Sequence, residues 1–119
     1  MPMKQFQVQH RSSNEIDILE LSGELDAHTA PVLEDAIKEL IHKEKLFIIV
    51  NFNGLEYIAS AGLGVFMAYI EEVRAKGGDI KLTNMNHRVF NVFDLLGFPA
   101  LYDIYADEAE ATNQYLNRP

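Results

Sequence analysis

Cysteine is absent from the 119-residue sequence, which excludes disulfide bonds and thiolate chemistry. Long hydrophobic runs are absent as well. No apolar stretch approaches the roughly 20 residues that a membrane-spanning helix needs, and residues 1–5 lack the hydrophobic centre of a secretion signal. We therefore expect a cytoplasmic protein that makes no use of a membrane.

Basic side chains are few. Ten lysines and arginines stand against eighteen aspartates and glutamates, which gives a net charge of -8. This charge opposes binding to nucleic acids and anionic lipids, because both are negatively charged. Partners should therefore be proteins or small molecules. The hydrophobic fraction of 48% and the charged fraction of 24% are ordinary for a soluble globular protein. A chain of this length predicts one domain over residues 1–119.

Signatures of metal and nucleotide sites are also missing. The four histidines show no H-x-x-x-H spacing and no close pairing, so we expect no metal site. Gly62 and Gly64 begin a G-x-G-x-x-G pattern, but Met67 stands where its third glycine would be. No Gly-Lys-Ser or Gly-Lys-Thr ends a glycine-bounded loop. Asn53 follows the most apolar segment, where a phospho-receiver would need an aspartate. We therefore expect no cofactor.

Alternation of apolar and polar residues predicts strands, and apolar residues three and four positions apart predict helices. Strands are expected at 6–10, 15–22, 46–52, 79–83 and 101–105, and helices at 31–41, 60–76, 86–96 and 107–116. Val32, Leu96 and Leu116 fall on the apolar faces of their helices, and Asn86 is expected to cap the third helix. The first two strands should form an antiparallel hairpin through a turn at 11–14. The order β-β-α-β-α-β-α-β-α implies crossover connections. It predicts an α/β fold with a mixed sheet of four to five strands, covered by about four helices.

Two features of this pattern have more than one interpretation. In the second strand two isoleucines alternate out of phase with two leucines, which indicates either two covered faces or a bulge. These residues are Ile16, Ile18, Leu19 and Leu21. The helix at 60–76 has an apolar surplus beside its expected core face, and the surplus fits either a neighbouring helix or a partner surface. The core face is Leu63, Phe66, Met67, Ile70 and Val73, and the surplus is Val65, Ala68 and Tyr69.

The stretch at 57–65 has the clearest functional character. It follows the apolar segment 46–52 and leads into a helix, so Ser60 falls at or beside the helix N-cap. One interpretation is plain capping, in which the hydroxyl accepts a hydrogen bond from an unpaired amide of the first turn. The other is a site for phosphate, because helix N-termini attract anions. Ala61, Gly62 and Gly64 are small and would leave the hydroxyl open to a kinase.

A serine between a strand and a helix also suggests the nucleophile elbow of a small hydrolase. Ser60-Ala61-Gly62 matches the second half of G-x-S-x-G, but Ile58 replaces the first glycine. The candidate bases and orienting carboxylates are His28, His87, Asp26 and Asp94. This hypothesis is the least favoured, because a chain of this length leaves little room for a substrate pocket.

Three segments carry a family resemblance. They are Gly23-Glu24-Leu25-Asp26, then Ile58-Ala59-Ser60-Ala61-Gly62-Leu63-Gly64-Val65, and finally Arg88-Val89-Phe90 through Asp94-Leu95-Leu96-Gly97-Phe98. In order and spacing they resemble the anti-sigma factor antagonists of the STAS family, over nearly the whole chain. The resemblance implies the STAS fold and a switch protein with no catalytic activity of its own.

The resemblance also implies partners. In such antagonists the unphosphorylated form binds an anti-sigma factor, which is a serine kinase of the histidine-kinase-like ATPase type, and so releases the sigma factor. Phosphorylation of a serine ends the binding, and a serine phosphatase restores it. Carried onto this chain, the acceptor is Ser60 and the nearby carboxylate is Asp26. The partner-binding segment consists of Ala59, Ser60, Ala61, Gly62, Leu63 and Gly64.

The chain departs from the family at one position. Many antagonists carry aspartate immediately before the acceptor serine, where this chain has Ala59. The change removes a carboxylate that could orient the hydroxyl or meet the kinase. The alternative function is a STAS module that does not switch. It would bind a small anionic ligand or nucleotide at the start of the Ser60 helix, or serve as a subunit of a signalling assembly.

Overall fold

The computed structural model describes residues 5–117 as one five-stranded sheet with α-helices around it. The elements are β1 (Gln7–Ser13), β2 (Ile16–Leu25), α1 (Ala30–His42), β3 (Phe47–Ile58), α2 (Ser60–Ala75), β4 (Asp79–Thr83), α3 (His87–Leu95), a short 3₁₀ helix η1 (Phe98–Ala100), β5 (Ile104–Tyr105) and α4 (Glu108–Leu116). This is the element order that the sequence predicts, and the α/β class is confirmed.

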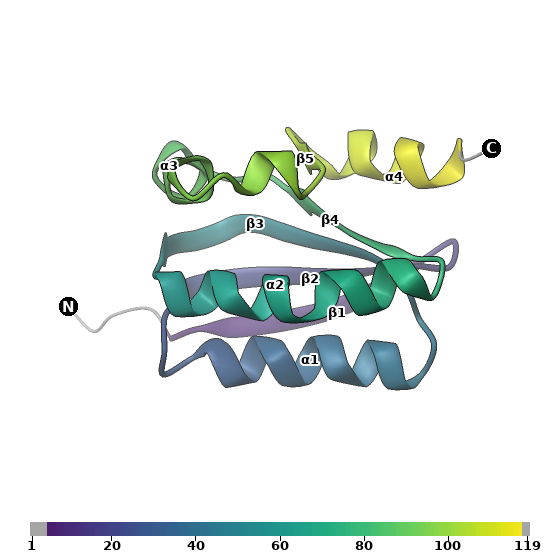
Figure 1. Cartoon of the computed structure of the whole chain (residues 1–119), viewed down its shortest axis with the longest axis horizontal. Coiled ribbons are helices and arrows are strands. Elements are labelled where there is room, and N and C mark those ends of the chain that lie inside the picture. The colour runs from purple at the N-terminus through teal and green to yellow at the C-terminus, as the bar shows by residue number, and fades with distance from the viewer. Residues whose placement is uncertain (1–4, 118–119) are drawn as a thin grey trace.

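The sheet is mixed, as predicted, and its strands lie in the order β1-β2-β3-β4-β5. β1 pairs antiparallel with β2, and the other neighbours pair parallel. β3 is therefore the central strand, which explains why its first half is apolar on both faces. Figure 1 shows α1 and α2 running along the sheet, with α3 and α4 beyond β3. α3 shares the larger core with α1 and α2, whereas α4 packs on the opposite face of the sheet.

The hairpin turn is shorter than predicted. β1 continues to Ser13, and the turn consists of Asn14 and Glu15, whose φ angles are +52° and +67°. The expected turn at 11–14 was wrong because Arg11 and Ser12, which read as turn residues, are held in the strand by side-chain contacts. Arg11 lies 3.3 Å from Glu20, and the Ser12 hydroxyl donates to Asp17 over 2.7 Å.

Both interpretations of β2 hold. Leu19 and Leu21 join the larger core beneath α1 and α2, whereas Ile16 and Ile18 pack on the opposite face with Ala111 and Tyr115 of α4. The strand thus has two covered faces. The pairing of β2 with β3 also shifts register between Glu20 and Ser22 and again between Gly23 and Glu24, which are the irregularities expected of bulges.

β3 is longer than the apolar segment that marks it. It runs twelve residues to Ile58, whereas the sequence indicated a strand ending at Phe52 followed by a loop. The second half, with Asn53, Gly54 and Glu56, has no strand-like pattern, but it pairs with the end of β2 across the two register shifts. Pairing with a neighbouring strand overrides the weak local signal. The carboxyl ends of β2 and β3 consequently lie side by side.

The apolar surplus of α2 is explained by α1 for two of its three residues. Val65 is buried in the larger core, and Tyr69 packs against that core. The Tyr69 hydroxyl donates to Glu34 of α1 over 2.8 Å. This hydrogen bond is the larger cause and burial the smaller cause that raise the pKa of Tyr69 to about 12. Ala68 is exposed. The neighbouring-helix interpretation is therefore correct for Val65 and Tyr69.

Some apolar residues expected in the core are exposed instead. Their exposed fractions range from 49% to 57%, and they are Val32, Met67, Leu96 and Leu116. Val32 and Leu116 lie in the first and last turns of their helices, and Leu96 follows the last residue of α3. Periodicity does not show which end of a helix extends past the sheet. The expected strand at 101–105 is likewise shorter and contains only Ile104 and Tyr105, because the chain turns at 101–102 directly after η1.

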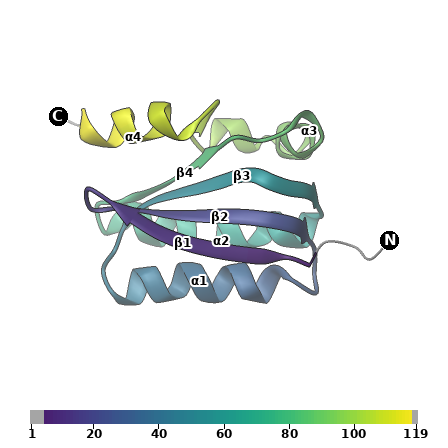
Figure 2. The same ribbon diagram turned by 180° about the vertical axis from the view of Figure 1, so that it is seen from behind.

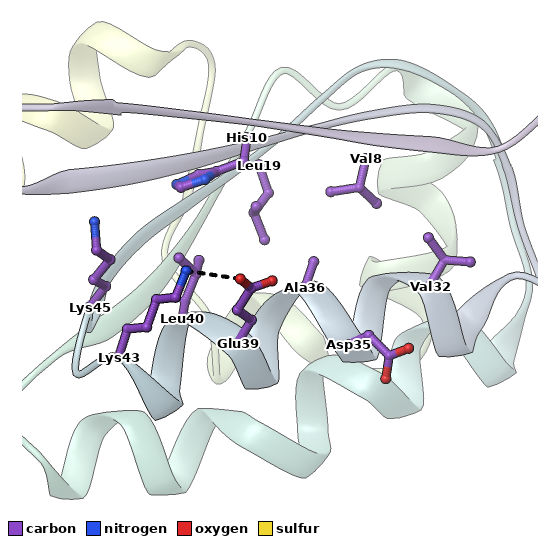
Figure 3. A pocket seen from close by; sticks show the side chains of 10 residues that line it. All are labelled: Val8, His10, Leu19, Val32, Asp35, Ala36, Glu39, Leu40, Lys43 and Lys45. Carbon is purple, nitrogen blue, oxygen red and sulfur yellow. Dashed lines mark hydrogen bonds and ion pairs between the residues drawn. The ribbon is translucent and has the colours of Figure 1, made fainter.

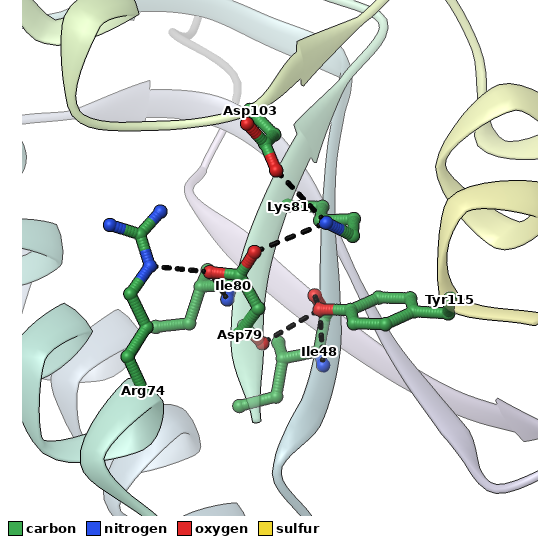
Figure 4. A network of polar contacts seen from close by, with 7 residues as sticks. All are labelled: Ile48, Arg74, Asp79, Ile80, Lys81, Asp103 and Tyr115. Carbon is green, nitrogen blue, oxygen red and sulfur yellow. Dashed lines mark hydrogen bonds and ion pairs between the residues drawn. The ribbon is translucent and has the colours of Figure 1, made fainter. Parts of the chain in front are cut away.

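A polar network fastens α4 to the sheet (Figure 4). The hydroxyl of Tyr115 lies 2.7 Å from the carbonyl oxygens of both Ile48 and Asp79 and accepts from the Ile48 amide over 3.1 Å. The Lys81 ammonium lies 4.8 Å from the centre of the Tyr115 ring. It also donates to Asp79 over 3.1 Å and to Asp103 over 3.0 Å. The network joins β3 and β4 to the last helix.

Candidate functional site

Ser60 is the first residue of α2, and its side chain is exposed. The N-cap is Ala59, whose extended backbone has φ -103° and ψ 165° and whose methyl group cannot accept a hydrogen bond. No side chain caps this helix. Within residues 5–117 the Ser60 hydroxyl has no hydrogen-bond partner, so the plain capping interpretation is wrong. The hydroxyl faces solvent.

Asp26 follows the carboxyl end of β2, beside the start of α2. The Ala59 amide donates to the Leu25 carbonyl over 2.8 Å, and Leu25 pairs with Ile58 in the sheet. Because parallel strands end at the same edge of a sheet, this pairing brings the turn at Asp26 next to Ser60. The sequence prediction that Asp26 lies near the Ser60 segment agrees with this geometry.

The Asp26 carboxylate also stabilises the turn in which it lies. Its Oδ1 accepts from the His28 amide over 2.9 Å and the Thr29 amide over 3.1 Å. The Thr29 hydroxyl lies 3.2 Å from the same oxygen and 3.0 Å from the Glu24 carbonyl. These contacts hold the turn that leads into α1. Sequence reasoning missed Thr29, although an aspartate followed three residues later by threonine is a recognisable turn pattern.

The remaining partner-binding candidates divide into exposed and buried residues. Ala61 and Gly64 are exposed, whereas Gly62 and Leu63 are buried. A Cβ at Gly62 would lie 2.6 Å from Cγ of Leu25, so only glycine lets α2 approach the end of β2 so closely. A Cβ at Gly64 would meet nothing within 4 Å. Gly62 and Leu63 therefore position the backbone, and the accessible surface around Ser60 is formed by small residues.

The outer face of α2 extends this surface. Ser60, Gly64 and Met67 are four and then three residues apart, which places them on one face of the helix. Met67 is 53% exposed, and Tyr57, three residues before Ser60, is 45% exposed. Sequence reasoning placed Met67 in the core and passed over Tyr57. The only sequence signal for this exposed face was the apolar surplus of the helix, which is too wide for one buried stripe.

The electrostatics of the helix start favour an anion. The first turn of α2 contains no acidic residue, so nothing in that turn neutralises the partial positive charge of the helix N-terminus. Amide groups of a first turn have no partner within the helix and can donate to a phosphate. These amides can therefore offset a negative charge on Ser60, against repulsion from the Asp26 carboxylate in the neighbouring turn.

The hydrolase hypothesis finds no support in the geometry. Among the hydrogen bonds of residues 5–117, neither His28 nor His87 reaches Ser60 through its ring. Asp26 holds a turn and does not orient a histidine ring. Nucleophilic catalysis by serine requires a base within hydrogen-bond reach. In that same part of the chain, no group of three or more metal-ligating side chains converges, and no helix has the length and hydropathy to cross a bilayer.

Comparison with known proteins gives concordant matches. The family model for the STAS domain matches residues 7–111. The anti-sigma-B factor antagonist of Bacillus subtilis is 34% identical over 94 residues, covering 78% of this chain and 85% of the relative. The anti-sigma factor antagonist SpoIIAA in its unphosphorylated form is 28% identical with a TM-score of 0.79, covering 97% of this chain and 99% of that one. The phosphorylated SpoIIAA of Bacillus, also 28% identical, has a TM-score of 0.70 and covers 93% and 99%.

Proposed function

Because the chain belongs to the STAS-domain family of anti-sigma factor antagonists, we propose that it is a regulatory protein that controls the availability of a sigma factor by binding an anti-sigma factor. It acts through residues 1–119 as a single domain and carries out no reaction itself. The observation that supports this most directly is the bare Ser60 hydroxyl at the start of α2, surrounded by small and exposed residues.

The switch is phosphorylation of Ser60. A phosphoryl group adds a charge of about -1.5 to -2 and considerable bulk at the centre of the proposed binding surface. The free amide groups in the first turn of α2 can donate hydrogen bonds to the phosphoryl oxygens without a change of fold. The partner, which packs on Ser60, Ala61 and Gly64 when the hydroxyl is free, meets a desolvated dianion when it is phosphorylated. Binding is lost while the domain stays folded.

The proposed partners follow from this switch. The anti-sigma factor is a serine kinase of the histidine-kinase-like ATPase type, which binds the unphosphorylated chain and then transfers phosphate from ATP to the Ser60 oxygen. A serine phosphatase restores the free hydroxyl. Asp26, one residue beyond Leu25, lies where it can contact the kinase. Its Oδ2 makes no hydrogen bond within residues 5–117 and is available to a partner.

The uncapped start of α2 also fits the second candidate, a STAS module that binds a small anion or nucleotide there without switching. The two candidates differ in what happens to Ser60. Incubation with the candidate kinase and ATP, followed by intact mass measurement, should show one added phosphate in the wild type and none in Ser60→Ala. Ser13→Ala, a change at another exposed serine, serves as the matched control and should be modified like the wild type. Tight binding of the kinase without phosphate transfer would instead support a non-switching subunit of a signalling assembly.

A further inference from the structure

β1 has an open outer edge. It is the first strand in the sheet order, and in the described part of the chain, residues 5–117, no segment pairs with its outer side. Natural proteins protect such edges with lysine, proline or bulges. The β1 sequence QVQHRSS contains neither lysine nor proline, and its arginine, Arg11, is paired with Glu20 and Glu108. Its pairing with β2 runs without a register shift from Gln7 to Ser13. The edge is therefore regular and ready to pair.

α1 lies beside this open edge. Figures 1 and 2, which view the molecule from opposite sides, both show α1 running alongside β1 on the side away from β2. A helix that covers a sheet normally packs over strands that are present. Here α1 extends past the edge strand β1. It therefore lies beneath a position next to β1 where the described chain has no strand.

The space between β1 and α1 is a groove of about 350 Å³ (Figure 3). Between the two elements it is lined by the imidazole of His10 and by five apolar side chains, which are Val8, Leu19, Val32, Ala36 and Leu40. Val32 is 49% exposed, although the sequence pattern places it on the core face of α1. Something that covers this groove would bury Val32 and the half-buried Val8.

The rim of the groove carries charge of both signs in a definite order. Asp35 lies toward the start of α1, whereas Lys43 and Lys45 lie at and beyond its end. Glu39, between them, lies 2.9 Å from Lys43, and Lys45 lies 3.8 Å from Asp17. Both lysine side chains are nevertheless about half exposed, so that a carboxylate of a partner can reach them. Figure 3 shows the two lysines at one end of the groove and Asp35 toward the other. This arrangement gives a bound segment a preferred direction.

A second copy of the chain does not fit the groove through its own β1. In a symmetric dimer joined by two antiparallel β1 strands, each α1 would cover the other copy's β1. The two α1 helices would then lie about one strand spacing, or 4.8 Å, apart. Packed helices need about 8–10 Å between axes. The occupant must be a strand that has no helix of its own on this face.

We propose that the groove between β1 and α1 binds an extended segment of a partner protein, which adds to the sheet beside β1. Its backbone pairs with the outer edge of β1, which is the usual source of affinity in strand addition. Its alternate side chains point toward α1, and these are apolar next to Val8 and Val32. A carboxylate of the segment lies near Lys43 and Lys45. This surface is separate from Ser60 and does not depend on phosphorylation.

The test begins with the full chain and a displayed library of peptides of about ten residues, the length of a long strand. We expect enriched peptides to carry apolar residues at every second position and an acidic residue toward one end. A synthesised enriched peptide should slow hydrogen exchange of the β1 amides. Val32→Lys should weaken its binding about tenfold or more, equivalent to at least 1.4 kcal/mol. Leu116→Lys, which also replaces a half-exposed apolar residue by lysine but on α4, should leave binding unchanged.

Backbone pairing and direction are tested with the same peptide. Of two versions that are N-methylated on alternate residues, one should lose binding and the other should keep it, because only one set of amides faces β1. Lys43→Glu should reverse the preference for an acidic end. Ser60→Ala should bind like the wild type, which separates this proposal from the switch. The proposal is overturned if no alternating pattern is enriched, if Val32→Lys binds as well as the wild type, or if both methylated peptides bind equally.

Discussion

At the scale of single residues, the site depends on what is missing from the side chains around Ser60. Ala59 cannot cap α2, Gly62 permits the approach to Leu25, and Gly64 adds no side chain to the exposed face. A serine in this setting has neither a structural partner within residues 5–117 nor a neighbour that shields it. A hydroxyl group in that position is accessible to a protein kinase.

The two glycines should respond oppositely to the same substitution. Gly62→Ala places a methyl group 2.6 Å from Leu25, and overpacking of this kind costs about 1–3 kcal/mol of unfolding free energy. Gly64→Ala meets open space and should stabilise α2 by up to about 1 kcal/mol, because alanine is the better helix former. Urea unfolding of both variants measures the difference. Equal effects of the two changes would contradict the assigned packing of Gly62.

Ala59 offers a second test at this scale. Ala59→Asp supplies the missing N-cap acceptor and should raise the free energy of unfolding by about 0.5–2 kcal/mol. The carboxylate next to Ser60 should also speed phosphate transfer from the kinase, because it can orient the hydroxyl. Ala61→Asp, a change at an exposed position, is the control, since this aspartate interacts with the helix dipole without capping the helix. The interpretation of Ala59 fails if stability stays at the wild-type value.

At the scale of elements, α4 is attached to the sheet by few groups. Only Ala111 and Tyr115 of this helix are buried, where they pack on Ile16, Ile18 and Ile49. Polar contacts of the Tyr115 hydroxyl and of Glu108 with Arg11 and Asn51 add to this packing. Tyr115→Phe keeps the ring but leaves the Ile48 amide without the Tyr115 oxygen. We expect a loss of about 1–3 kcal/mol, the usual cost of an unpaired buried group. Amide exchange should accelerate in α4 while α1, which lies far from Tyr115, is unaffected. Uniform acceleration in both helices would contradict the local attachment.

Lys81 adds a pH dependence to the same attachment. Burial acts to lower the pKa of Lys81, but its hydrogen bonds with Asp103 and Asp79 outweigh burial and raise that pKa above its ordinary value of 10.5. The stabilisation is therefore complete below pH 10.5 and is lost as the pH rises through the higher folded-state pKa. Urea unfolding as a function of pH should show a smaller alkaline decline in Lys81→Met than in the wild type. Identical declines would show that the Lys81 charge contributes no stability.

At the scale of the whole molecule, strong local patterns predicted the fold and weak ones did not. The period of α1 and the apolar run of β3 gave the element order, and Asn86 was correctly expected to cap α3, where it accepts from the Val89 amide. The second half of β3 was missed because its strand geometry comes from pairing with β2. Single-domain organisation over residues 1–119 stays a prediction. The roles assigned to Asp26 and Ser60 also stay predictions, since they concern interactions with partners outside the chain.

The candidate site was predictable in part for the same physical reason. A serine at a strand-to-helix junction is visible in the sequence, and so is the small size of its neighbours. Whether its hydroxyl caps the helix or faces solvent depends on where the helix begins, to within one residue. Sequence patterns do not fix helix ends that closely. The exposure of Met67 and the empty strand position beside β1 depend on how the helices sit on the sheet, which no local pattern records.

The central claim is that phosphate on Ser60 changes partner binding without changing the fold. The most direct measurement is the dissociation constant of the anti-sigma factor for the unphosphorylated chain and for the same chain stoichiometrically phosphorylated at Ser60, at one salt concentration. We expect the phosphorylated form to bind more than about a hundredfold more weakly, a loss of about 3 kcal/mol. Equal affinity of the two forms would contradict the switch.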